Sequence, residues 1–115
     1  MIGEILVAES FDESARRFEG PEAAHVAAFV DKLVASPNGH GVRFEPVREA
    51  HESHMVSARV SLALRAIAYE CADVLTLLWV DHHDQAYAWA RTRCVECHPL
   101  TGRVVRVYEA EDDEA

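Results

Sequence analysis

The chain has 115 residues, of which 50% are hydrophobic and 27% are charged, and its formal net charge is −9 at pH 7. This size and composition are typical of one globular domain and exclude a largely disordered chain. The longest mainly apolar run, residues 74–80, has the length of a strand and is too short to span a bilayer. Because the N-terminus also lacks the cationic region of a secretory signal, we expect a cytoplasmic protein with no membrane partner.

The first third of the chain predicts a short edge strand followed by two helices. The strand is expected over residues 5–8. Ser10 is then expected to cap the first helix, with Glu13 three residues later completing a capping box. Pro21 suits the first turn of a second helix, which we expect to run to about Ser36.

The hydrophobic period then changes from that of a helix to that of a strand. Strands are expected over residues 43–47, 55–61, 64–70 and 74–81, a third helix from residue 82 to about 91, and a last pair of strands over 94–98 and 104–108. Asp81 is expected to cap the third helix. The order predicts an α+β fold, in which an N-terminal helical hairpin packs on a small, mainly antiparallel sheet with a third helix.

Five acidic residues crowd the last seven positions of the chain. They are Glu109, Glu111, Asp112, Asp113 and Glu114. We therefore assign residues 1–108 to the folded domain and residues 109–115 to an acidic C-terminal tail. The tail either solubilises the chain or folds back over basic residues of the domain and screens them.

The hairpin within residues 55–70 allows its strand register to be predicted. With the turn centred on Leu62, Ala58 lies opposite Ala66 and the apolar face of the hairpin closes. The same register places Arg59 opposite Arg65, where like charges destabilise the pair by roughly a few tenths to 1 kcal/mol. Either neighbouring carboxylates lie between the two guanidinium groups, or the pair binds an anion such as phosphate.

The third helix begins at a strand-to-helix corner that holds two histidines, His82 and His83. His83, Tyr87 and Arg91 follow at intervals of four residues and would form one polar stripe. The helix dipole favours anions at this corner, and histidine can exchange a proton near neutral pH. The alternative is that these side chains only cap the helix and pack across the sheet.

Three cysteines, Cys71, Cys94 and Cys97, raise the question of a disulfide or a metal. Their odd number argues against a disulfide framework. The spacing from Cys94 to His98 matches haem attachment and also suggests zinc, but the segment is predicted to be a strand with Cys94 and Cys97 on opposite faces. We therefore expect small buried thiols, with no metal and no other cofactor.

Three stretches carry a family resemblance: Ser-Ala-Arg-Val at residues 57–60, Leu-Arg-Ala-Ile at 64–67, and Leu-Leu-Trp-Val-Asp-His-His-Asp-Gln-Ala-Tyr-Ala-Trp-Ala at 77–90. They resemble the RelE/ParE toxin superfamily, and more narrowly the RelE-like branch that also occurs at the N-terminus of UvrD-like helicases. The resemblance implies the toxin of a type II toxin–antitoxin system. Such a toxin cuts mRNA, typically in the ribosomal A site, and is neutralised by a cognate antitoxin.

The resemblance also implies roles for individual residues. Arg65, His83 and Tyr87 fall at catalytic positions, and Arg59, Arg65, His82 and Arg91 would bind substrate phosphate. The expected reaction is metal-independent cleavage by the RNA 2′-hydroxyl, with His83 as acid or base and Tyr87 assisting.

Two other functions stay open for such a chain. One is a non-catalytic RelE-like binding or regulatory module, which the acidic charge and a leucine at position 64 favour, since many relatives have tyrosine there. The other is a ParE-like inhibitor of a protein target. Base or codon preference and the identity of the antitoxin are not encoded in recognisable motifs, and a homodimer is left open.

Overall fold

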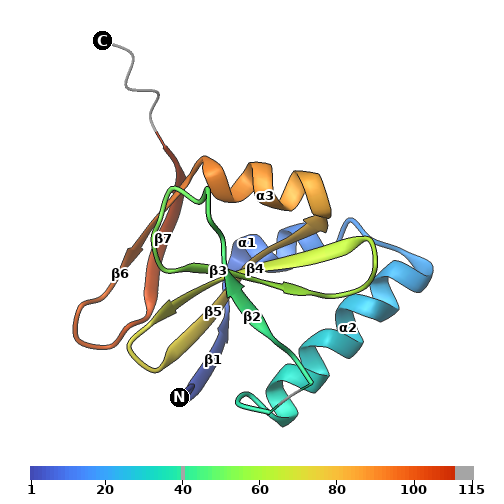
Figure 1. The fold of residues 1–115 in the computed structure, drawn as a ribbon, viewed down its shortest axis with the longest axis horizontal. Helices are drawn as coiled ribbons and strands as arrows, with labels where there is room; N and C mark the ends of the chain where they lie inside the picture. Colours follow the sequence, from blue (N-terminus) through green and yellow to red (C-terminus); the bar gives the residue numbers. More distant parts are fainter. Residues whose placement is uncertain (40, 111–115) are drawn as a thin grey trace.

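A computed structural model describes residues 1–39 and 41–110, which form a five-stranded sheet with helices on both faces (Figure 1). The elements in chain order are β1 (Glu4–Val7), α1 (Glu9–Ala15), α2 (Gly20–Ala35), β2 (Phe44–Pro46), β3 (Met55–Arg59), β4 (Leu64–Cys71), β5 (Val74–His82), α3 (His83–Arg91), β6 (Arg93–Cys97) and β7 (Val104–Glu109). The strand order is β1-β5-β4-β3-β2, with β1 parallel to β5 and the other pairs antiparallel. The α+β prediction is confirmed.

The main sheet separates two hydrophobic cores. On one face, α2 packs Phe29 and Leu33 against the sheet, while on the other face α3 packs Ala86, Trp89 and Ala90. Strands β4 and β5 supply side chains to both cores, because alternate residues of a strand point to opposite faces. The β6–β7 hairpin forms a separate two-stranded sheet and closes the core beneath α3.

The cap predicted for the first helix is wrong. Ser10 lies inside α1, the N-cap position is Ala8, and no side chain caps this end of the helix. The Ser10 hydroxyl instead donates a hydrogen bond to the carbonyl oxygen of Leu78, 2.6 Å away on β5. The Ser10 hydroxyl, which the local sequence pattern assigned to the helix cap, therefore forms a tertiary hydrogen bond instead.

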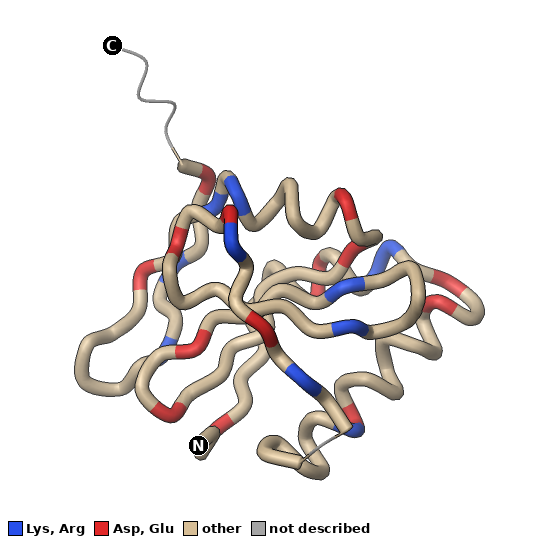
Figure 2. Tube along the Cα trace, viewed as in Figure 1, with Lys and Arg blue, Asp and Glu red and all other residues tan. Residues whose placement is uncertain are grey.

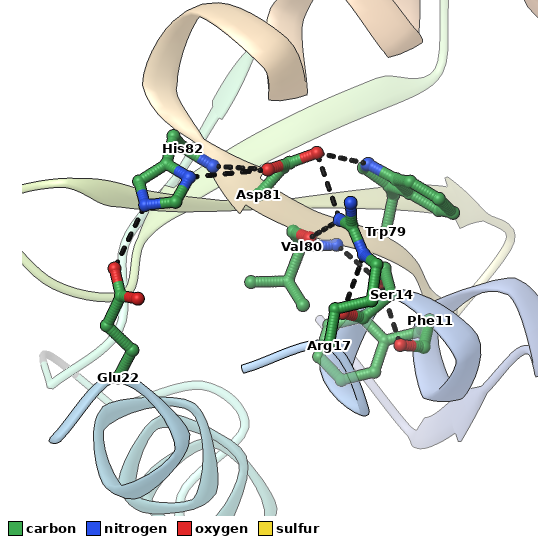
Figure 3. Close-up of polar contacts among 8 residues, drawn as sticks. All are labelled: Phe11, Ser14, Arg17, Glu22, Trp79, Val80, Asp81 and His82. Atoms are coloured by element: carbon green, nitrogen blue, oxygen red, sulfur yellow. Dashed lines mark hydrogen bonds and ion pairs between the residues drawn. The ribbon is translucent and has the colours of Figure 1, made fainter. Parts of the chain in front are cut away.

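The cap predicted for the third helix is also wrong. Asp81 belongs to β5, and the N-cap of α3 is His82, again without a side-chain hydrogen bond to the helix. The Asp81 carboxylate instead accepts hydrogen bonds from Arg17 at 3.0 Å and from the Trp79 indole at 3.3 Å (Figure 3). The charged side chain of Arg17, in the turn after α1, binds this carboxylate in place of the helix end.

The last strand ends one residue later than the strand predicted over residues 104–108. β7 ends at Glu109, so the last strand includes the first residue assigned to the acidic tail. Residues 111–115 of that tail lie outside the described residues. In the described part of the chain, no helix is long and apolar enough to cross a membrane.

Candidate functional site

The predicted register of the β3–β4 hairpin is confirmed. Ala58 lies opposite Ala66, and Arg59 lies opposite Arg65. Figure 2 shows the basic positions side by side on the two strands. Both arginines follow the strand alternation that places Ala58 and Ala66 in the core under α2, so they project from the opposite face, where α3 lies.

The two guanidinium groups have different surroundings. Arg65 is half-buried, and its Nη1 atom donates to the carbonyl oxygens of Ser61 at 2.8 Å and Leu64 at 2.9 Å. Arg59 is exposed, and no described residue forms a hydrogen bond or ion pair with its guanidinium group. No described carboxylate forms an ion pair within 4.0 Å of either guanidinium group. Arg65 is oriented by its own loop, and Arg59 is open to a ligand.

His83 and Tyr87 meet on the first turns of α3. Their rings contact edge to face with centroids 4.7 Å apart, and the Tyr87 hydroxyl lies 3.1 Å from the Ser57 hydroxyl on β3. The Nδ1 atom of His83 lies 3.0 Å from the Asp84 carboxylate, and its backbone N–H donates to the carbonyl of Ala63. Because an ionised carboxylate can only accept, Nδ1 is the donor in this contact, and Nε2 forms no hydrogen bond with a described residue.

Two adjacent hollows share His83 and Tyr87 as a common wall. The first has a volume of about 500 Å³, and its other lining residues are Pro46, Val47, Arg48, Glu49, Asp84 and Arg91. The second has a volume of about 520 Å³, and its other lining residues are Arg43, Glu45, Ser57, Ala58, Arg59 and Arg65. The histidine and tyrosine of one helix thus stand between two open depressions of the same surface.

The two hollows differ in charge. In the first, Arg48 and Arg91 are matched by two carboxylates, and Arg91 pairs with Glu49 at 3.4 Å. In the second, three arginines face a single carboxylate, that of Glu45. The second hollow therefore favours an anionic ligand, and guanidinium groups suit phosphate in particular.

Several lining residues of these hollows, among them Arg43, Arg48 and Ser57, were not predicted as site residues from the sequence. Ser57 precedes Arg59 by two residues on one strand, so the alternation already placed it on the same face. Arg43 and Arg48 flank β2, and their positions depend on the pairing of β2 with β3 at the sheet edge. The sequence carried no signal for that pairing.

His82 does not join the other predicted site residues. Its Nε2 atom lies 2.9 Å from the Glu22 carboxylate of α2, and its ring packs edge to face against Phe18. Figure 3 shows the ring turned toward Glu22. Successive residues of an extended strand point to opposite faces, which separates the two neighbouring histidines. The structure brings together Arg59, Arg65, His83 and Tyr87, and it leaves His82 outside this group.

The cysteines only partly match the expectation of small buried thiols. Cys94 is buried, but Cys71 and Cys97 are partly exposed, and their sulfur atoms lie 3.3 Å apart. Within residues 1–39 and 41–110, no three histidine, cysteine or acidic side chains converge in a way that could hold a metal ion.

Comparison with known proteins finds similarity in structure alone. No family model and no curated protein matches the sequence. The chain is similar to a chain of the RelB–RelE antitoxin–toxin complex from Methanococcus jannaschii, at 12% identity and a TM-score of 0.58, over 73% of this chain and 96% of the other. It is similar to a chain of the toxin–antitoxin complex RelBE2 from Mycobacterium tuberculosis, at 17% identity and a TM-score of 0.55, over 72% and 100%.

A third similar structure is the Escherichia coli DinJ–YafQ complex, at 12% identity and a TM-score of 0.55, over 70% of this chain and 93% of the other. Identities this low show the fold alone. The chain therefore has the RelE-like toxin fold, as the sequence resemblance implied.

Proposed function

We propose that this chain is the toxin of a toxin–antitoxin pair and that it cleaves mRNA on the ribosome. The RelE-like fold supports the general class. The observation that carries the proposal is the second hollow, in which three arginines surround one carboxylate beside the His83–Tyr87 contact. RNA phosphate matches that charge, and the imidazole supplies the proton transfer that RNA cleavage needs.

In the proposed reaction, the RNA 2′-oxygen attacks the adjacent phosphorus and the bond to the 5′-oxygen breaks. Arg59 binds the phosphate, and Arg65 adds positive charge from its loop-held position, so both stabilise the charge that develops on the phosphoryl oxygens. His83 uses its free Nε2 atom as acid or base. Tyr87, held against Ser57, positions the imidazole or stacks on a base.

Inducible expression of matched variants tests this function. Wild-type protein should stop growth and cut mRNA, whereas Arg59→Ala and His83→Ala should relieve both effects. Arg59 is the better arginine for this test than Arg65, because Arg65 also holds the 61–64 loop through its hydrogen bonds. His82→Gln is the matched control: the neighbouring histidine faces Glu22, so its loss should leave cleavage within about twofold of wild type, because exposed ion pairs contribute little.

The proposal fails if wild-type protein leaves mRNA intact in the presence of ribosomes. It also fails if His82→Gln abolishes cleavage while His83→Ala retains it. Growth arrest with intact mRNA would point to inhibition of a protein target instead.

A non-catalytic binding module with the same fold is the second candidate. It is favoured by the net charge of −9 and by the commitment of the Arg65 guanidinium group to backbone carbonyls. Such a module would still bind a cognate antitoxin-like partner but would cut no RNA. Co-purification of a small partner protein with an inert wild-type chain would support it.

A further inference from the structure

Two cysteine side chains from distant parts of the chain meet at one end of the molecule. Cys71 ends β4 and Cys97 ends β6, and their sulfur atoms lie 3.3 Å apart. Both residues are partly exposed, so a small reagent can reach them. The third cysteine, Cys94, is buried three residues earlier on the same strand. The molecule therefore contains one accessible pair of thiols in contact and one separate, sheltered thiol.

Independent contacts hold the two cysteines in this arrangement. The β6–β7 turn lies directly on the end of β4, where a Cβ atom on Gly102 would stand 2.7 Å from the carbonyl oxygen of Cys71. Gly102 has φ of +75°, so this close approach depends on glycine. Arg103 next to it forms an ion pair with Glu4 of β1 at 2.8 Å. The contacts that hold the β6–β7 hairpin against the main sheet thus also hold the two thiols together.

Two groups beside the Cys97 sulfur have raised pKa values. Burial, followed by interactions with Cys97, raises the pKa of the Tyr69 hydroxyl to about 12. The hydrogen bond with Cys97, followed by burial, raises the pKa of the Cys71 thiol. Both groups stay protonated near neutral pH and can donate to the Cys97 sulfur. This arrangement favours Cys97 as the sulfur that reacts first.

We propose that Cys71 and Cys97 form a redox-active dithiol pair, which peroxides convert to an intramolecular disulfide between the β6–β7 hairpin and the main sheet. The Cys97 sulfur attacks one peroxide oxygen and becomes a sulfenic acid, while the other oxygen leaves as water. The Cys71 sulfur then displaces the sulfenic hydroxyl, which leaves as a second water. Overall, two thiols are oxidised and one hydrogen peroxide is reduced to two waters. A dithiol reductant reverses the reaction by exchange.

The crosslink encloses the element that carries the candidate site. The closed loop between Cys71 and Cys97 contains β5, α3 and β6, and therefore His83 and Tyr87. A covalent closure of this length restricts the unfolded chain and stabilises the folded one. We expect the oxidised protein to melt roughly 5–15 °C above the reduced protein. This inference does not depend on the proposed RNA cleavage.

The test uses the purified full chain, reduced and then treated with hydrogen peroxide at a small molar excess. Intact mass should fall by two hydrogen atoms, and peptide mapping should join Cys71 to Cys97 and leave Cys94 as a free thiol. Dithiothreitol should restore both the mass and the lower melting temperature. Cys94→Ala should behave as wild type, whereas Cys71→Ser and Cys97→Ser should lose the melting shift, with circular dichroism confirming that both variants fold.

Three results would overturn the proposal. The first is a disulfide that includes Cys94 or joins two molecules. The second is oxidation of Cys97 to a sulfinic acid while Cys71 remains a thiol. The third is formation of the Cys71–Cys97 bond with an unchanged or lower melting temperature, which would show that the hairpin must be distorted to close it.

Discussion

At the scale of single residues, Asp81 shows how one buried carboxylate joins distant parts of the fold. It is 8% exposed, and it accepts hydrogen bonds from the Arg17 guanidinium group, the Trp79 indole and the backbone N–H of His82 (Figure 3). Burial alone would raise its pKa, but the hydrogen bonds from Arg17 and His82 outweigh burial and lower the pKa below the ordinary 3.8. The ionised form is therefore the one that the folded state prefers.

Asp81→Asn should lower the free energy of unfolding at pH 7 by about 1–2 kcal/mol, a moderate value because Arg17 is half exposed. A lowered pKa in the folded state gives stability that is complete above the unfolded pKa of about 3.9 and lost as pH falls through the folded value. The gap between wild type and variant should therefore close below about pH 4. Urea unfolding across pH measures it, with exposed Asp31→Asn as the control, and a gap independent of pH would contradict the assignment.

Replacement of a second buried residue, Thr76, should raise the free energy of unfolding rather than lower it. Thr76 is 3% exposed on β5, and its hydroxyl oxygen has no hydrogen-bond partner among the described residues. Thr76→Val keeps the shape of the side chain and removes the unsatisfied group, so it should raise the free energy of unfolding by up to about 1 kcal/mol. Urea unfolding at constant pH measures this change. Loss of stability would mean that the hydroxyl is satisfied after all.

At the scale of elements, α1 completes an edge that β1 leaves open. β1 pairs with β5 only over residues 74–77. Beyond that point, the Ser10 hydroxyl donates to the Leu78 carbonyl, and the Val80 N–H donates to the Ser14 hydroxyl at 3.0 Å. Helix side chains thus satisfy the backbone of an internal strand where a neighbouring strand is missing. This explains why α1 lies along β5 and why its serines do not cap it.

A stack of four side chains joins further elements at the same place. Arg17, just after α1, lies over the ring of Trp79. The rings of Trp79 and Trp89 are nearly parallel, with centroids 5.1 Å apart. Arg93 lies over the ring of Trp89. The stack connects β5, α3 and β6. Cation–π and aromatic contacts of this kind contribute roughly 0.5–1.5 kcal/mol each.

Ser14→Ala tests the role of α1 at the strand edge. The substitution leaves the buried Val80 N–H without its acceptor, so the free energy of unfolding should fall by about 1–3 kcal/mol. Ser53→Ala, at an exposed loop position, is the control and should change stability by less than about 0.5 kcal/mol. Chemical denaturation of both variants provides the comparison. Equal effects would show that another group satisfies the strand.

At the scale of the whole molecule, charge is distributed unevenly. The chain carries −9 overall, yet one hollow gathers Arg43, Arg59 and Arg65 around a single glutamate. Under the proposed function, the acidic remainder should repel RNA at long range, so RNA binding would depend on this local patch. Affinity for RNA should therefore be modest and strongly dependent on salt.

Measuring RNA affinity at several salt concentrations tests whether the arginines of this hollow contact RNA phosphate. Removing one phosphate contact from a single strand reduces the slope of log affinity against log salt by about 0.7, so Arg59→Ala should show that loss. Arg103→Ala is the matched control, because Arg103 pairs with Glu4 and lines neither hollow of the site. Fluorescence anisotropy with a short RNA oligonucleotide measures both slopes. Identical slopes for Arg59→Ala and wild type would remove Arg59 from the phosphate site.

Local patterns in the sequence determined the fold class and the β3–β4 register. Alternation of apolar residues along a hairpin depends only on near neighbours, and one slip would expose a whole face, so Arg59 had to lie opposite Arg65. The approach of His83 to Tyr87 follows in the same way from the spacing of one helix.

Only the tertiary structure decided which partner each polar group takes. Ser10 and Asp81 had plausible local roles as caps, but groups on distant elements bind them more strongly. At the end of β5, His82 and His83 point to opposite faces of the sheet, and His82 contacts Glu22. Cys71 contacts Cys97 because the β6–β7 hairpin packs against the main sheet. Such contacts join residues far apart in the chain, so their energies depend on packing that no local pattern encodes.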